Sequence, residues 1–292
     1  MNNSMINSMV TLHALQQKLD IVSNNMANVN TVGYKRREAT FEDILNNIKQ
    51  QPAGFQKEGR LSPLGFNQGW GAKLSQVQMS MSQGAMKETG TATDIAIEGE
   101  GLFEVVRNTV DENGNALQEA LYTRDGAFDL IVQPGDPENR YLATKEGYHV
   151  RDTNDQPITV PIGFRMAVDT NGDIRVYDEG NPSNTFLTGQ RVKLMRAVRP
   201  QYLQQIGDNL FVLPQTVANG PAAGQVIRVA NNGAGSGLET PITVRQGFLE
   251  QSNVNMADEM TELMMVQRAF QMGSRAITSS DTMMNLANNL RG

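Results

Sequence analysis

Residues 256–287 read MADEMTELMMVQRAFQMGSRAITSSDTMMNLA, and their apolar side chains repeat with a period of seven. The bulky members of this repeat are Met256, Leu263, Phe270, Ile277 and Met284, and the mostly small members three positions later are Val266, Gly273, Ser280 and Ala287. This spacing puts both rows on one face of an α-helix, as in a coiled-coil seam. The stretch predicts a helix from about 253 to 290 that needs a partner along its length.

The first 33 residues carry a matching pattern. One row consists of Met5, Leu12, Leu19 and Met26, and a second row on the same face consists of Leu15, Val22 and Val29. The other faces are unusual, because Lys18 and Asp20 are the only charged residues between Met1 and Gly33. A solvent-exposed helix face normally carries charge, whereas amides and hydroxyls can be buried if each finds a hydrogen-bond partner. We therefore expect this helix to be packed on more than one side and to pair with the C-terminal one.

Residues 94–245, between the helical ends, follow a different pattern. They contain short runs rich in β-branched and aromatic residues, separated by turn signals such as Asn113-Gly114 and Asn171-Gly172. This segment predicts an all-β domain. The expected fold is therefore α+β, with long terminal helices at 1–33 and 246–292 pairing as a coiled coil around a central all-β domain.

Residues 34–93 are expected to form an extended linker. Within them, residues 46–76 combine five glycines and two prolines with the only tryptophan, Trp70, and show no clear period. We interpret this part as a glycine-rich excursion. The basic run Lys35-Arg36-Arg37 is interpreted as a solvated turn, with binding to a neighbour's carboxylates as the alternative.

Composition excludes several classes of partner. The chain has 292 residues, a net charge of -6 and a pI near 5.1, and its Lys and Arg residues are scattered, which argues against nucleic-acid or anionic-membrane binding. No apolar run approaches the roughly 18 residues that a membrane span requires, so no membrane insertion is expected. The N-terminus lacks the features of a cleaved signal peptide. From these features alone, a cytoplasmic protein is expected.

Residues suited to catalysis or metal binding are scarce. The sequence has no cysteine and only two histidines, His13 and His149, so we expect no enzyme, no cofactor and no metal site. The run Asp169-Thr-Asn-Gly-Asp173 is similar to a calcium loop, but Gly180 stands where the bidentate glutamate belongs. A hairpin turn is the favoured interpretation of this run.

Three segments resemble one known family in the right order. The N-terminal residues are Leu19-Asp20, Ser23-Asn24-Asn25, Ala27-Asn28, Asn30 and Gly33-Tyr34-Lys35; the central ones are Gly99-Glu-Gly101-Leu-Phe103 and Tyr122-Thr-Arg-Asp-Gly126; the C-terminal ones are Gly247, Leu249-Glu250, Ser252-Asn253-Val254, Glu259-Met260 and Gln267-Arg268. Together they are similar to the signatures of the rod and hook proteins of the bacterial flagellum. The length and the excursion after Phe41-Glu42-Asp43 are most similar to the distal rod branch of that family.

The resemblance implies a structural protomer of the flagellar basal-body rod. It implies a helical tube that transmits torque from motor to hook, with the terminal helices in the innermost layer. The implied partners are other copies, neighbouring rod and hook proteins, and the flagellar type III export apparatus. The implied location is the basal body, outside the cytoplasmic membrane, after export without a cleaved signal peptide. The alternative function is a soluble, helix-flanked β binding module or adhesin that does not polymerise.

The same resemblance suggests why four of the seven residues from Asn24 to Asn30 are asparagine. In a dense array of helices, Asn24, Asn25 and Asn28 can bond to neighbouring backbones or amides without the desolvation cost of a charge. Asn30 and Gly33 would then end the helix. The alternative is a frayed, solvated last turn.

Two sets of residues are expected to mediate assembly. The self-assembly set is Met5, Leu12, Leu15, Leu19, Val22, Asn24, Asn25, Met26, Asn28, Met256, Met260, Leu263, Phe270, Ile277 and Met284. The stiffening set, within the excursion, is Phe55, Leu61, Leu64, Phe66 and Trp70. We expect the second set to lie against neighbouring protomers, because a disordered linker rarely carries so many apolar side chains.

Overall fold

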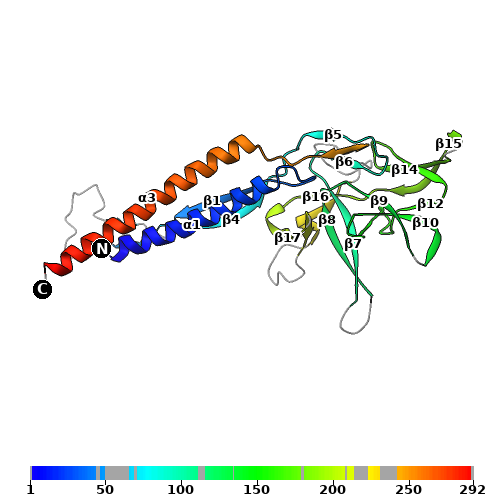
Figure 1. The fold of residues 1–292 in the computed structure, drawn as a ribbon. Helices are drawn as coiled ribbons and strands as arrows, with labels where there is room; N and C mark the ends of the chain where they lie inside the picture. Colours follow the sequence, from blue (N-terminus) through cyan, green and yellow to red (C-terminus); the bar gives the residue numbers. More distant parts are fainter. Residues whose placement is uncertain are drawn as a thin grey trace, which may run out of the picture. The chain divides into compact units, whose positions relative to one another are not determined.

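The computed structural model has an α+β fold with a helix at each end of the chain and a β-rich middle (Figure 1). It describes residues 2–43, 47–49, 66–68, 71–110, 116–133, 135–178, 181–207, 209–213, 223–230 and 242–290. The chain divides into two compact units. The helical unit comprises 1–27, 37–78 and 255–292, and the β-rich unit comprises 28–36 and 79–254.

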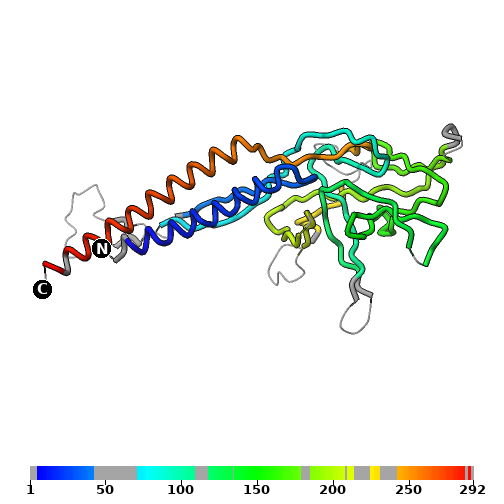
Figure 2. Tube along the Cα trace, in the orientation of Figure 1, coloured from blue at the N-terminus to red at the C-terminus, as the bar shows by residue number. Residues whose placement is uncertain are grey.

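The helical unit contains two long helices, α1 (Asn2–Ala27) and α3 (Met256–Asn289). They lie side by side and run antiparallel, as the trace in Figure 2 shows. Asn255 caps α3, because its Oδ1 accepts a hydrogen bond of 3.0 Å from the Ala257 N–H, and Asp258 and Glu259 complement the helix dipole in the first turn. The predicted helix at each end of the chain is therefore confirmed, but α1 ends at Ala27, before Asn30 and Gly33, where its end was expected.

A β-ribbon completes the helical unit, and the sequence did not predict it. Strand β1 (Arg37–Asp43) pairs with β4 (Ala72–Met79), and β2 (Asn47–Lys49) pairs with β3 (Phe66–Gln68), so that Lys49 lies opposite Phe66. Both ends of the expected linker thus form paired strands. Of the stiffening set, Phe55, Leu61, Leu64 and Trp70 lie outside the described residues, and Phe66 is placed only as the first residue of β3.

The β-rich unit is built on a ten-stranded sheet. Its main path runs in the order β12 (Thr159–Pro161), β10 (Asp136–Ala143), β11 (His149–Val150), β7 (Leu102–Val110), β8 (Ala116–Thr123), β18 (Leu210–Val212) and β17 (Gln204–Gly207). Strand β9 (Asp129–Gln133) pairs with β10, and β16 (Leu194–Ala197) pairs with β7 and with β19 (Ile227–Val229). A short helix, α2 (Ala223–Val226), precedes β19, and a 3-10 turn, η2 (Pro200–Tyr202), precedes β17.

Three smaller sheets accompany the large one. Strands β13 (Phe164–Val168), β14 (Asp173–Asp178) and β15 (Asn181–Arg191) form one of them. The other two are pairs: β6 (Ile95–Glu98) with β20 (Thr243–Gln246), and β5 (Met86–Glu88) with β21 (Phe248–Glu250). The compact unit is therefore wider than the expected domain 94–245, because strands on both sides of that range pair with each other.

The core of the β-rich unit lies between these sheets. Phe103 and Phe128 are almost fully buried and meet edge to face, with ring centroids 5.1 Å apart. Leu121, Leu142 and Ile158 are fully buried around them. Strands β7 and β8 pair in regular antiparallel register from Phe103 opposite Thr123 to Val110 opposite Ala116, which fixes the positions of the core side chains.

The run that is similar to a calcium loop connects β13 to β14 as a hairpin turn. Gly172 adopts a φ of 83° and donates its N–H to the Asp169 carbonyl at 2.8 Å. The two carboxylates are used within the chain, since Asp169 pairs with Arg175 and Asp173 pairs with Arg191. The hairpin interpretation is confirmed.

Among the described residues, none of the helices has the length and hydropathy that a membrane span requires.

Candidate assembly surface

Helix α1 is packed on two sides within the helical unit. On one side, Leu12 meets α3 at Gly273, where an added Cβ would lie only 2.8 Å from a Leu12 methyl carbon. On the other side, α1 meets the β-ribbon, where an added Cβ at Gly71 would lie 3.0 Å from the Asn7 carbonyl oxygen. A glycine at each contact lets the elements approach closely, and Gly71 also needs its φ of 92°. This packing on two sides agrees with the amide-rich, nearly uncharged surface of α1.

Asn25 joins three elements of the helical unit. Its side chain donates to the Arg37 carbonyl and accepts from the Arg37 N–H, both at 3.0 Å, as a paired strand residue would. It also donates to the Glu259 carboxylate of α3 at 3.3 Å. Asn25 and Glu259 are 1% and 0% exposed, so an apolar residue at position 25 would leave buried polar groups unpaired. The amide therefore has a structural role inside a single copy of the chain.

The other asparagines of this region behave differently. Asn24 is exposed on α1, and Asn28 accepts a hydrogen bond of 3.2 Å from the Thr31 hydroxyl in the turn that follows. Gly33 ends this turn with a φ of 68°. The contacts that Asn24 and Asn28 would make with neighbouring copies remain a prediction.

Charged groups link the helices and the ribbon. The Lys18 Nζ lies 2.7 Å from a Glu262 carboxylate oxygen, and it also lies 5.6 Å from the centre of the Phe41 ring in β1. Both side chains of the ion pair are about one quarter exposed, so water screens the pair and its contribution is at most about 1 kcal/mol. Packing, rather than this pair, must hold the helices together.

The residues of the heptad rows and of the self-assembly set differ in how far they are buried. Of the C-terminal set, Val266 is buried and Met256, Leu263, Ile277 and Met284 are partly buried, whereas Met260 and Phe270 are exposed. Of the N-terminal set, Val22 is buried and Met5, Leu12, Leu15, Leu19 and Met26 are partly buried. The buried residues of α1 also include Ala14 and Asn25, which lie outside the heptad rows, and Asn25 contacts Arg37 of β1. Partial burial leaves area on these rows for further contacts.

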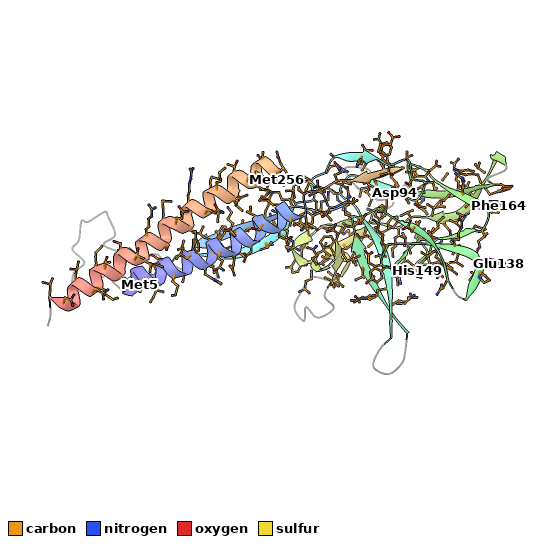
Figure 3. The ribbon with its side chains drawn as sticks, in the orientation of Figure 1. Met5, Asp94, Glu138, His149, Phe164 and Met256 are labelled. Carbon is orange, nitrogen blue, oxygen red and sulfur yellow. The ribbon has the colours of Figure 1, made fainter. Side chains whose placement is uncertain are left out.

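An exposed apolar row that the heptad pattern does not contain runs along α3 and ends at Leu290, the residue that follows the helix. Its members are Met265, Met272, Met283 and Leu290, whose exposed fractions are 60%, 65%, 57% and 88%. They are separated by seven, eleven and seven residues, intervals at which an α-helix returns to nearly the same direction. Figure 3 shows side chains along the outer side of α3 beyond Met256. On α1, Ile6 and Met9 are also exposed, at 41% and 68%. Large exposed apolar surfaces mark binding sites.

The β-rich unit contains a buried charge cluster. Glu250 pairs with Lys35, whose Nζ lies 2.8 Å from Oε1, and with the Arg124 guanidinium, and all three side chains are at most 2% exposed. Lys35 also donates to the Ser82 carbonyl, and Arg124 donates to the Gly101 and Ile97 carbonyls. Both interpretations of Lys35 were wrong. Its side chain is buried rather than solvated, and it pairs with a carboxylate of the same chain rather than of a neighbouring copy.

Burial governs the electrostatics of this cluster. Desolvation is the largest influence on the pKa of Lys35 and lowers it, with the Arg124 charge adding to this and Glu250 opposing it. Burial likewise lowers the pKa of Arg124, and Glu250 again opposes the effect. The Glu250 carboxylate thus offsets part of the desolvation cost of two buried cations. The residues come from the N-terminal, central and C-terminal family signatures, which meet at this point.

Known families match all three of these signatures. Residues 5–35 match the flagella basal body rod protein family, residues 96–176 match the flagellar hook protein FlgE/F/G D1 domain, and residues 245–290 match the flagellar basal body rod FlgEFG protein C-terminal family. The flagellar basal-body rod protein FlgG of Borreliella burgdorferi is 33% identical over 95% of this chain and 94% of its own. The chain belongs to the flagellar basal-body rod protein family.

Other relatives of this rod-family chain span it equally well. The flagellar basal-body rod protein FlgG of Buchnera aphidicola subsp. Baizongia pistaciae is 32% identical over 94% of both chains. The flagellar hook-basal body complex protein FlhP of Bacillus subtilis is 32% identical over 100% of both. The expected likeness to the distal rod branch, of which FlgG is the member, is confirmed.

Proposed function

We propose that this chain is a structural protomer of the flagellar basal-body rod that polymerises into a helical tube and transmits torque from motor to hook. The observation that carries the proposal is the exposed row formed by Met265, Met272 and Met283 on α3 and by Leu290 directly after it. A single copy leaves this row in water, although α1 and the β-ribbon cover other sides of the helical unit. Methionine adapts its shape to a partner, which suits a surface that must fit neighbouring copies. The likeness to flagellar basal-body rod proteins FlgG supports the same role.

The finer parts of the proposal concern how the protomer reaches and enters the rod. We place it in the basal body outside the cytoplasmic membrane, after type III export without a cleaved signal peptide. Its partners are other copies and the adjoining rod and hook proteins. In the assembled tube, α1 and α3 form a coiled coil through their partly buried heptad rows, with Leu12 against Gly273 as the contact already made in one copy. The role is structural rather than catalytic.

Met272→Glu tests the exposed row. A carboxylate there would be buried in every subunit contact at a cost of several kcal/mol, so we expect the concentration needed for polymerisation to rise by about tenfold or more. Cells carrying only this variant should lose motility. The control is Ser274→Glu, which adds the same charge on an exposed, nearly opposite side of α3, because two residues turn a helix by about 200°. Equal effects of both variants would contradict a specific role for the row.

The excursion is proposed to stiffen the tube by lying against neighbouring protomers through Phe55, Leu61, Leu64, Phe66 and Trp70. Lys49 and Phe66 are register partners in the β2–β3 pair, so residues 50–65 can be replaced by an Asn-Gly turn without separating these strands. We expect polymers of this variant to form but to bend more easily, as measured from their persistence length by electron microscopy. Unchanged stiffness would refute the proposal. A replacement of 50–65 by sixteen glycine and serine residues controls for loop length.

A further inference from the structure

Two edges of the ten-stranded sheet have opposite charge. The first, called the acidic edge, consists of β9, β10 and β12, which contain three carboxylates, Asp129, Asp136 and Glu138, and one cation, Arg140. Arg140 is only partly exposed and donates to the Phe164 carbonyl. Asp129 and Glu138 are exposed, and Glu138 is labelled on this edge in Figure 3. The acidic edge therefore presents negative charge to solvent.

The second edge, called the basic edge, consists of β16, η2, β17 and β19 with the residues between β16 and η2. It contains three arginines, Arg196, Arg199 and Arg228, and no carboxylate. Arg196 and Arg228 are direct cross-strand partners, and like charges in this arrangement repel. Glu100 offsets part of the repulsion, at 3.0 Å from Arg196, while Arg199 and Arg228 are exposed. A chain of net charge -6 has thus gathered cations at one place.

Both edges also expose apolar side chains. On the acidic edge this is Val132 of β9, which is 52% exposed. Ile162 directly follows β12 and is 53% exposed, and its N–H donates a 3.0 Å hydrogen bond to the Glu138 carbonyl of β10. On the basic edge, Val198, Ile206 and Val229 are 47%, 49% and 54% exposed. Each edge thus combines an apolar part with charge of one sign, as the two sides of a protein interface do.

We propose that the acidic edge of one copy binds the basic edge of the next copy. The occupant is a second copy because this family self-assembles and because the charges of the two edges are complementary. The sheet order places β12 at one end and β17 at the other, while β16 and β19, which carry Arg196 and Arg228, branch from β7 (Figure 1). A contact between two different surfaces is heterologous and generates open filaments rather than closed dimers. The inference rests on the proposed function and adds a second, β-rich contact to the helical one.

Cross-linking tests the contact directly, because the chain has no cysteine of its own. The full-length variant Ile162→Cys with Val229→Cys carries one thiol on each edge. With a short bismaleimide, we expect a ladder of covalent oligomers, whereas each single variant should give at most dimers. A double variant that gives no more than the single variants overturns the inference.

A charge exchange tests the chemistry of the same contact in this cysteine background. Glu138→Arg alone and Arg228→Glu alone should each lower the ladder yield by about tenfold, and the two together should restore it to within about threefold, because the pair is then reversed. Raised salt should lower the yield of the unexchanged chain. Unchanged yields in the single variants, or a combined variant as poor as they are, contradict the proposal.

The two proposals fail in different ways. If the chain forms filaments but gives no ladder, the edge contact is wrong and the helical contact stands. If Met272→Glu leaves filaments intact while the ladder is present, the helical contact is wrong and the edge contact stands.

Discussion

Glu250→Gln is expected to destabilise the β-rich unit by about 3–5 kcal/mol, because it removes the carboxylate that pairs with two buried cations. The amide keeps the shape of the side chain, so the loss reflects charge rather than packing. Lys35 and Arg124 would remain buried without the carboxylate that they both contact. The measurement is hydrogen exchange in β7 and β8, together with the calorimetric melting temperature of this unit. A loss of this size corresponds to about 10 °C.

The matched control is Glu98→Gln, which makes the same chemical change at an exposed site. Glu98 lies 3.9 Å from Arg245, and both side chains are more than half exposed, so the effect should stay within about 0.5 kcal/mol. Replacing all three charges of the cluster by apolar residues should not restore stability. The cluster also satisfies the Ser82, Ile97 and Gly101 carbonyls and the Gly84 N–H, which an apolar cluster would leave unpaired. An unaltered melting temperature for Glu250→Gln would contradict the assigned role.

The helices were predictable because their signal is local. A heptad row needs only neighbouring residues to be recognised, and the cap residue Asn255 lies two residues before Ala257, whose N–H donates to it. The charge cluster has no such signal. Lys35 and Glu250 are 215 residues apart, and Arg124 and Glu250 are 126 apart, so nothing in the periodicity connects them. Only the family signatures marked these residues, and they did so without revealing that the residues meet.

Contacts between residues far apart in the sequence also explain why the expected domain boundaries differ from those of the compact units. A boundary at 94 and 245 follows the change in sequence pattern, but it separates Arg124 from both Lys35 and Glu250. The sequence did not predict strands β1 and β4, because apolar and polar residues alternate little in their sequences, REATFED and AKLSQVQM. They are stabilised by the contact with α1 at Gly71 and Asn25, a tertiary effect that overrides weak local preference. The exposed row on α3 was missed because the heptad interval does not reach from Met272 to Met283.

Gly126→Ala is expected to have an effect of similar size for a steric reason. A Cβ at this position would lie 1.7 Å from the backbone carbonyl oxygen of Ile95, a distance that no side-chain movement can relieve. The backbone there is held, because Ile95 and Phe128 each donate an N–H to the Gly126 carbonyl at 3.0 Å. Ile95 and Phe128 are almost fully buried in the core, so moving the strand would disturb its packing.

We therefore expect Gly126→Ala to destabilise the β-rich unit by more than about 4 kcal/mol, measured by the same calorimetric and hydrogen-exchange experiments. Gly135→Ala is the matched control, because it has no atom within 4 Å of its added Cβ and no positive φ. There, alanine should be neutral or stabilise by about 0.4–1 kcal/mol, since it reduces the freedom of the unfolded chain. Position 126 belongs to a family signature, and its glycine is required by contact with a neighbouring backbone rather than by turn geometry. If the Gly126→Ala and Gly135→Ala variants melted at the same temperature, the backbone at Ile95 would be able to move away from the added Cβ, and the prediction would be wrong.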